Sequence, residues 1–398
     1  MIATFARFPL YYTVSLTCCQ TGTLLKIPKY TGFGVKDLDT FFCGASFHAF
    51  SCCFPQAKGY RLLALRGKSD LQKAAIFQKV SRRLREENRA FIRLLKSSCP
   101  AQTVGILLPE EHVFALDCDY FAGISEEYPC AAKISFSADP PSFARISEEE
   151  KERLTAQDAL IAESKQRAQS FQEAAASLHA ENRQLLVPCI DKAAVLRFLF
   201  RFLQKKNGRI LCREKTGAAV EHREISGITG WGIQTLYTPF SARGLETIVL
   251  KDNIGAVSET LLNGLAALCT QNGLSVRLFH CGLTGAAEHC VIPALSAAFF
   301  TENCSHPFPL RAKGTIPASR FVHLPAFAEV LPEVRFNAAA ADEILEEAVF
   351  SQLEADEITA AREQILQPYT DEAYLDSISE QIYKSLLKTN GQFDESYF

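Results

Sequence analysis

Two segments of the chain repeat one succession of apolar and polar positions. In the first, an apolar run that begins at Arg61 is followed by a turn with Gly67 and then by an amphipathic run. In the second, the apolar run begins at Glu246 and the turn contains Gly255. A short apolar run bounded by a turn is typical of a buried strand, and apolar positions three and four residues apart are typical of a helix. The pattern predicts strand–turn–helix units at 61–85 and 246–270.

The similarity of the two segments continues along the chain. Each is followed by a strand-like run with an Arg-Leu pair, a second run with a proline at its head, an Ala-Lys pair and a Pro-x-Phe triplet, with small slips in spacing. Because the whole order recurs, we infer an internal duplication. In chain order the landmarks are Arg93-Leu94 and Arg277-Leu278, Pro109 and Pro293, Ala132-Lys133 and Ala312-Lys313, and Pro141-Ser142-Phe143 and Pro325-Ala326-Phe327.

The alternation of strands and helices predicts an α/β protein with two units, each built on a mainly parallel sheet covered by helices. Charged, periodic stretches outside the units predict helical extensions, interrupted at Pro188 and Pro368. The expected organisation is an N-terminal leader over 1–37, a first α/β unit over 38–145, a helical segment over 146–206, a second α/β unit over 207–330 and a C-terminal helical segment over 331–398.

Composition narrows the function classes. The net charge of −3 over 398 residues gives no electrostatic reason to expect nucleic acid or an anionic membrane as a partner. The 14 cysteines include no Cys-x-x-Cys pair, so we interpret them as small buried residues in a reducing cytoplasm. The first 23 residues are apolar, but Pro9 interrupts the core that a signal peptide needs, and we expect an extra strand or a poorly ordered leader. No later run reaches the length of a membrane span.

The ordered landmarks resemble a family of bacterial proteins with two P-loop ATPase-like halves in one chain, described as uncharacterised nucleotide-binding or nucleotide kinase-like proteins. The resemblance covers about residues 40–390 and is best in the second half. It implies P-loop NTPase-like units and ATP or GTP with Mg²⁺ as the ligand. The matching segments are the aromatic-glycine stretch 41–50, His280-Cys281, the run from Val291 to Leu295, and Leu116-Asp117 with Ser305-His306 at the strand ends.

Both phosphate-binding loops depart from the family pattern. In the first half Gly67 stands at the first loop glycine and Lys73 at the phosphate lysine. Gln72 replaces the second glycine, and Ala74 replaces the hydroxyl that would bind Mg²⁺. Lys73 is either a residual phosphate ligand or a solvated helix residue. Asp117 ends an apolar strand and is either a Mg²⁺ ligand or a turn residue.

The second loop keeps Gly255 and Thr260 from the pattern. Its departures are Asp252 for the first glycine, Val257 for the second, Ser258 for the lysine and Glu259 for the Mg²⁺-binding hydroxyl. Because a β-branched residue resists positive φ, Val257 predicts that the cradle of N–H groups does not form. The nucleotide-binding candidates that the resemblance implies are Gly67, Lys73, Asp117, Gly255 and Thr260.

Other residues suggest weaker alternatives. His280-Cys281 and His289-Cys290 lack two further placed ligands, so the sequence predicts no metal site. No base partner is identifiable for Cys281 as a nucleophile. Trp231 either stacks on a ligand or anchors a core, and we expect the core. An apolar stripe from Ile344 to Leu353 predicts packing on its own domain, or an exposed face for a protein partner or a second copy.

Two hypotheses of function follow. Phosphoryl transfer depends on the lysine, Mg²⁺ and loop amides, and each loss removes about 10²-fold or more in rate. The first hypothesis is a non-catalytic descendant of a duplicated P-loop ATPase, with no catalytic residues, that acts as a scaffold or regulatory interaction protein and binds nucleotide weakly, if at all, in its first half. The alternative is an active ATPase or nucleotide kinase-like enzyme that uses an atypical loop.

Overall fold

The structure is a computed structural model that describes residues 40–43, 59–121, 130–207, 218–237, 240 and 244–388. All of them fall within one unit of the chain, residues 36–398. The predicted leader over 1–37 and most of the aromatic-glycine stretch lie outside the described residues.

Both predicted strand–turn–helix units are present. In the first, β2 (Arg61–Arg66) leads through a three-residue turn into α2 (Asp70–Glu86), and the Ser69 side chain caps the helix by accepting from the N–H of Gln72. In the second, β10 (Glu246–Lys251) leads into α6 (Ala256–Gln271). Gly255 supplies the helix N-cap with φ of +83°, a conformation that a β-branched residue would resist.

The remaining strands give the two units the same topology. In the first unit the strand order is β1-β3-β4-β5-β2-β6, and in the second it is β7-β11-β12-β13-β10-β14. In both, the third strand in this order is antiparallel to its neighbours and the other neighbouring strands pair in parallel. The strands are β1 (Thr40–Cys43), β3 (Ile92–Lys96), β4 (Cys99–Leu108), β5 (Val113–Asp117), β6 (Ala132–Ser137), β7 (Val220–Glu224), β11 (Val276–His280), β12 (Ala287–Ile292), β13 (Ala297–Glu302) and β14 (Gly314–Pro317).

The sheets are therefore mixed, and the expectation of mainly parallel sheets needs this refinement. A sheet of five strands (β3, β4, β5, β2 and β6) and a sheet of six strands (β7, β11, β12, β13, β10 and β14) are linked through β1. β1 pairs in parallel with β3 and meets β7 antiparallel at Phe42 and Glu224. Register supports most of the sequence landmarks: Lys133 lies opposite Leu62 in the first unit, and Lys313 bonds to the equivalent Thr247 in the second. P-loop geometry does not follow from this topology alone.

One landmark was paired wrongly. Pro141 begins the 3-10 turn η2 (Pro141–Arg145), whereas Pro325 lies inside the first turn of a long helix. The turn that corresponds to η2 is η7 (Ala318–Phe321), since each directly precedes a long helix. The Pro-x-Phe match therefore arose between different elements.

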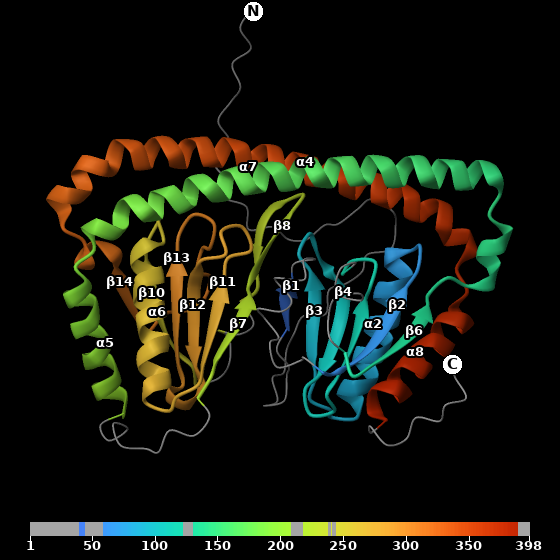
Figure 1. Ribbon diagram of the computed structural model, residues 1–398, viewed down its shortest axis with the longest axis horizontal. Helices are drawn as coiled ribbons and strands as arrows, with labels where there is room; N and C mark the ends of the chain where they lie inside the picture. Colours follow the sequence, from blue (N-terminus) through green and yellow to red (C-terminus); the bar gives the residue numbers. More distant parts are fainter. Residues whose placement is uncertain are drawn as a thin grey trace, which may run out of the picture. The chain divides into compact units, whose positions relative to one another are not determined.

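Two long helices pack along each other, α4 (Glu148–Leu186) and α7 (Leu324–Leu366) (Figure 1). Ser147 and Glu150 form a capping box at the start of α4. α7 begins at Leu324, inside the range that we had assigned to the second α/β unit. The stripe that includes Ala348 and Leu353 is buried or half-buried. α7 packs on α4 and also contacts β8 (Ser226–Thr229), which pairs with β9 (Gly232–Thr235).

The helices after α4 and α7 are exchanged between the units (Figure 1). α5 (Lys192–Asn207) follows the first unit in sequence but packs on α6 of the second, and α8 (Glu372–Leu387) follows the second unit but packs on α2 of the first. Leu375 and Leu386 of α8 belong to the same buried cluster as Phe77 of α2. The core of each unit is therefore completed by the short helix that follows the other unit in the chain.

Among the residues that the structure describes, no helix has both the length and the apolar character needed to cross a bilayer.

Candidate functional site

The helices α2 and α6 both begin before the position of the phosphate lysine. A P-loop places four residues between its first glycine and the Gly-Lys pair. In the first unit Asp70, Leu71 and Gln72 already belong to α2, so Lys73 lies within the first turns of the helix. In the second unit α6 begins at Ala256, and Ser258 is its third residue. Neither turn has the length of loop that wraps around a phosphate in a P-loop.

Carboxylates from the chain itself occupy the turn of the first unit. The N–H of Gly67 donates to Oδ2 of Asp119 at 2.8 Å, and the N–H of Lys68 donates to Oδ1 of Asp139 at 2.6 Å. Glu363 of α7 accepts from the Ser69 hydroxyl at 2.5 Å and from the N–H of Asp70 at 2.8 Å. A helix N-terminus favours anions, and here that role is filled by side chains.

Lys73 points into the protein. Its Nζ lies 3.0 Å from Oδ1 of Asp117, 3.0 Å from Oδ2 of Asp119 and 3.3 Å from Oδ1 of Asp70, and the side chain is 2% exposed. The alternative of a solvated lysine is therefore wrong. Burial alone would lower the pKa of Lys73, but the three carboxylates outweigh it and hold that pKa above its ordinary value. Lys73 therefore remains charged and is paired with these three carboxylates.

Asp117 accepts hydrogen bonds from the turn that follows it, in addition to its ion pair with Lys73. Its Oδ1 accepts from the N–H groups of Asp119 at 3.0 Å and Tyr120 at 3.2 Å, which forms the turn after β5. Burial raises the pKa of Asp117 although Lys73 opposes the shift. Asp70 is bound by Lys96 at 2.7 Å. Arg66 lies 3.8 Å from Oδ1 of Asp119, so the three aspartates of this group are each paired with a cation of the chain itself.

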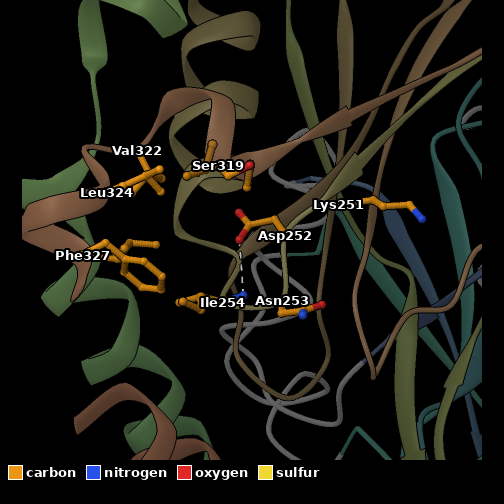
Figure 2. A pocket seen from close by; sticks show the side chains of 11 residues that line it. Lys251, Asp252, Asn253, Ile254, Ser319, Val322, Leu324 and Phe327 are labelled. Carbon is orange, nitrogen blue, oxygen red and sulfur yellow. Dashed lines mark hydrogen bonds between the residues drawn. The ribbon is translucent and has the colours of Figure 1, made fainter. Parts of the chain in front are cut away.

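In the second unit the side chain of Asp252 binds the backbone amides at the start of α6. Its Oδ1 accepts from the N–H of Ile254 at 3.3 Å (Figure 2). Oδ1 also accepts from the N–H of Gly255 at 3.0 Å, and Oδ2 accepts from the N–H of Ser258 at 2.8 Å. These amides converge on a side chain of the chain itself, because Gly255 and not Val257 adopts positive φ. The expected absence of a phosphate cradle stays a prediction. Val257 is helical and buried.

The other loop residues of the second unit have local partners. The Thr260 hydroxyl donates to the carbonyl of Ala256 at 2.8 Å within α6, so it is committed to the helix. Glu259 lies 3.4 Å from Arg183 of α4. The sequence candidates therefore form two separate groups: Gly67, Lys73 and Asp117 around the first turn, and Gly255 and Thr260 at the start of α6.

A cavity of about 190 Å³ lies beside the turn of the second unit (Figure 2). It is smaller than the roughly 300–1,000 Å³ of typical ligand pockets, and apolar side chains predominate in its lining. The lining residues are Leu186, Lys251, Asp252, Asn253, Ile254, Val257, Ala318, Ser319, Val322, Leu324 and Phe327.

A third group lies at the ends of β11 and β13. Cys281, Glu288 and His306 are buried and place their ligand atoms within 4.8 Å of one another. Nε2 of His306 is 3.3 Å from Sγ of Cys281, so a base partner for this cysteine does exist. Burial and Glu288 oppose ionisation of Cys281, yet His306 prevails and lowers the pKa of the thiol. Of the residues that the sequence analysis weighed for a metal site, Cys281 belongs to this group.

The remaining candidates do not join that group. His280 shares a hydrogen bond with His222 at 2.8 Å. His289 accepts from the N–H of Thr301 through Nδ1 at 3.1 Å. Trp231 is 65% exposed, so the expectation that it anchors a core was wrong.

Sequence reasoning missed the carboxylates that close the turns. Asp119 follows Asp117 by two residues, and a signal for it was the strand-end acidic pair. Asp139 and Glu363 carried no local signal, because Glu363 lies in the middle of a helical run almost 300 residues from Ser69.

Comparisons of this chain with protein-family models, with curated proteins and with solved structures found no match.

Proposed function

We propose that this protein is a non-catalytic relative of duplicated P-loop ATPases that acts as a scaffold or regulatory interaction protein. The supporting observation is the carboxylate of Asp252, which holds the amides of Gly255 and Ser258 where a phosphate would bind. A nucleotide would have to displace this buried side chain. Leaving buried donors or a buried charge unpaired costs about 1–3 kcal/mol or more.

The first unit supports the same proposal by different contacts. A phosphate at its turn would compete with Asp119, Asp139 and Glu363 for the amides of residues 67, 68 and 70. It would also compete with Asp117 and Asp119 for Lys73. Each competitor is already in place and needs no loss of translational freedom, which a free nucleotide must lose.

The alternative function is an active enzyme in the first unit. It is favoured by the 3.0 Å contact of Lys73 with Asp117, since these are the residues that would hold a phosphate and Mg²⁺. In this alternative Lys73 would turn from the aspartates to the phosphate when Mg²⁺ occupies the carboxylates.

Calorimetric titration with ATP and GTP, with and without Mg²⁺, separates the two functions. The proposal expects no saturable binding below about 1 mM, which corresponds to about −4 kcal/mol. Saturable micromolar binding that disappears in Lys73→Ala, and persists in the folded control Lys79→Ala on the same helix, would establish the alternative. Micromolar binding that survives in Lys73→Ala would place a site elsewhere and defeat both.

The interaction role is supported by two exposed aromatic side chains on α7. Phe336 is 72% exposed and Phe350 is 66% exposed, although most of α7 packs on α4. Exposed large apolar side chains favour a protein contact, here with a partner or a second copy. Light scattering across a concentration series tests the second copy: mass should rise with concentration, and Phe336→Ser with Phe350→Ser should suppress the rise. A strict monomer at high concentration rules out self-association.

A further inference from the structure

Three metal-binding side chains meet at the edge of the second sheet where the parallel strands end. Cys281 directly follows β11, Glu288 lies at the start of the antiparallel β12, and His306 follows β13. Nε2 of His306 lies 3.3 Å from Sγ of Cys281 and 2.8 Å from Oε2 of Glu288. The carboxyl edge of a sheet is where α/β proteins commonly place ligand sites.

Burial makes this group unusual. The three residues are between 0% and 6% exposed. Oε2 of Glu288 is buried without a hydrogen bond, and its close polar neighbour is Nε2 of His306 at 2.8 Å. A buried carboxylate is costly unless it is paired, and here one side chain supplies the pairing. A cation between the three side chains would bind this oxygen directly.

The orientation of His306 is set by groups outside the cluster. Its Nδ1 shares a hydrogen bond with the Thr235 hydroxyl at 2.9 Å, which leaves Nε2 directed at Cys281 and Glu288. The N–H of His306 donates to the Asn303 side chain at 2.8 Å, which holds the loop after β13. Metal-binding histidines usually have the second ring nitrogen held in this way.

We propose that Cys281, Glu288 and His306 bind one Zn²⁺ ion. A thiolate, an imidazole and a carboxylate are the ligands that zinc accepts, and three protein ligands leave a fourth position for water. With Zn–S near 2.3 Å and Zn–N near 2.0 Å, a tetrahedral site separates sulfur and nitrogen by about 3.5 Å. The observed 3.3 Å needs only a small adjustment. Binding displaces the protons of the thiol and of Nε2 into solvent.

The neighbouring His289 is excluded as a ligand by its own hydrogen bond. Nδ1 of His289 accepts a backbone hydrogen bond from Thr301, so the neutral ring carries its hydrogen on Nε2 and has no lone pair to offer there. The proposal therefore names three protein ligands, and only one of them is a thiol.

Cobalt substitution tests the proposal on the full-length, untagged protein. After chelator treatment, titration with Co²⁺ should show one tight equivalent, with sulfur-to-cobalt charge transfer in the near ultraviolet and tetrahedral visible bands, and Zn²⁺ should displace it. Elemental analysis should then find one zinc per chain. Cys281→Ser should remove the charge-transfer band and weaken binding by more than about 100-fold, beyond the usual cost of disturbing an outer contact. The matched control is Cys304→Ser, because Cys304 is exposed, lies near His306 and is outside the group.

The result that overturns the proposal needs no variant: wild-type protein that binds no Co²⁺ or Zn²⁺ stoichiometrically holds only a buried ion pair at this place. Charge transfer that persists in Cys281→Ser, or disappears in Cys304→Ser, would assign the metal to other cysteines. Glu288→Gln keeps the side-chain shape and should shift the visible bands while the charge-transfer band remains. Circular dichroism of each variant separates loss of a ligand from loss of the fold. None of these results depends on whether the turns bind nucleotide.

Discussion

Nζ of Lys73 and Oδ1 of Asp117 are 3.0 Å apart, and their side chains are 2% and 6% exposed. This contact joins the beginning of α2 to the end of β5. In an active P-loop enzyme the equivalent groups would face a nucleotide and its metal ion, whereas here they face each other. The ion pair has become part of the core of the first unit.

Removing one partner of this pair should destabilise the protein strongly. Lys73→Met leaves Asp117 buried without its cation, and such single removals cost about 3–5 kcal/mol. Urea denaturation at neutral pH measures the change. Lys79→Met on the same helix is the control, since Lys79 pairs with the exposed Glu372 and Asp376 and should lose no more than about 1 kcal/mol. Equal losses in the two variants would show that the buried pair has no special role.

The carboxylate of Asp252 should be needed for stability as well as for closing the second turn. Asp252→Ala leaves the amides of Gly255 and Ser258 without their acceptor, and we expect a loss of about 1–3 kcal/mol. Asp252→Asn keeps an acceptor oxygen and should lose less. Chemical denaturation compares the stability of the two variants. An alanine variant as stable as the wild type would show that the hydrogen bonds of Asp252 do not stabilise the turn.

Stability should depend on acid through Asp70. Burial alone would raise the pKa of Asp70, but Lys96 and Lys73 outweigh it and hold that pKa well below its ordinary value near 4. A depressed folded-state pKa gives stability that is present above the unfolded value and lost as the pH falls toward the folded value. Asp70→Asn should therefore be less stable than the wild type at pH 7. The difference should begin to shrink below about pH 5, where the unfolded carboxyl starts to bind protons.

Denaturant midpoints of wild type and Asp70→Asn between pH 3 and pH 8 check this dependence. The two curves should be parallel from pH 5 to pH 8 and converge below. A constant gap down to pH 3 would mean that folding does not lower the pKa of Asp70.

The exchanged helix α8 should be essential for the first unit. Leu375 of α8 is buried against that unit, so Leu375→Ala should cost about 2–5 kcal/mol. Leu160→Ala is the matched control, because Leu160 is half-exposed on α4. Thermal and urea unfolding compare them. A small effect at Leu375 would mean that α8 is not part of the first core.

Hydrophobic periodicity predicted the strand–turn–helix units at 61–85 and 246–270, because the burial of one face leaves a local pattern that can be read residue by residue. The repeated landmarks likewise corresponded to repeated elements where they lie in the strands, as Lys133 and Lys313 show. The Pro-x-Phe pair failed, since a proline is equally suited to a 3-10 turn and to the first turn of a helix. Breaks at Pro188 and Pro368 are present for the same local reason.

The amino-acid order alone also shows that both turns lack residues of a P-loop, because Gln72, Ala74, Val257 and Ser258 can be read directly. Which side chains bind the amides of the two turns was decided only in three dimensions. Glu363 approaches Ser69 because α7 passes the first turn, and His306 approaches Cys281 because β11, β12 and β13 lie side by side. Contacts between residues far apart in the chain depend on the packing of whole elements, which no local period of apolar residues encodes.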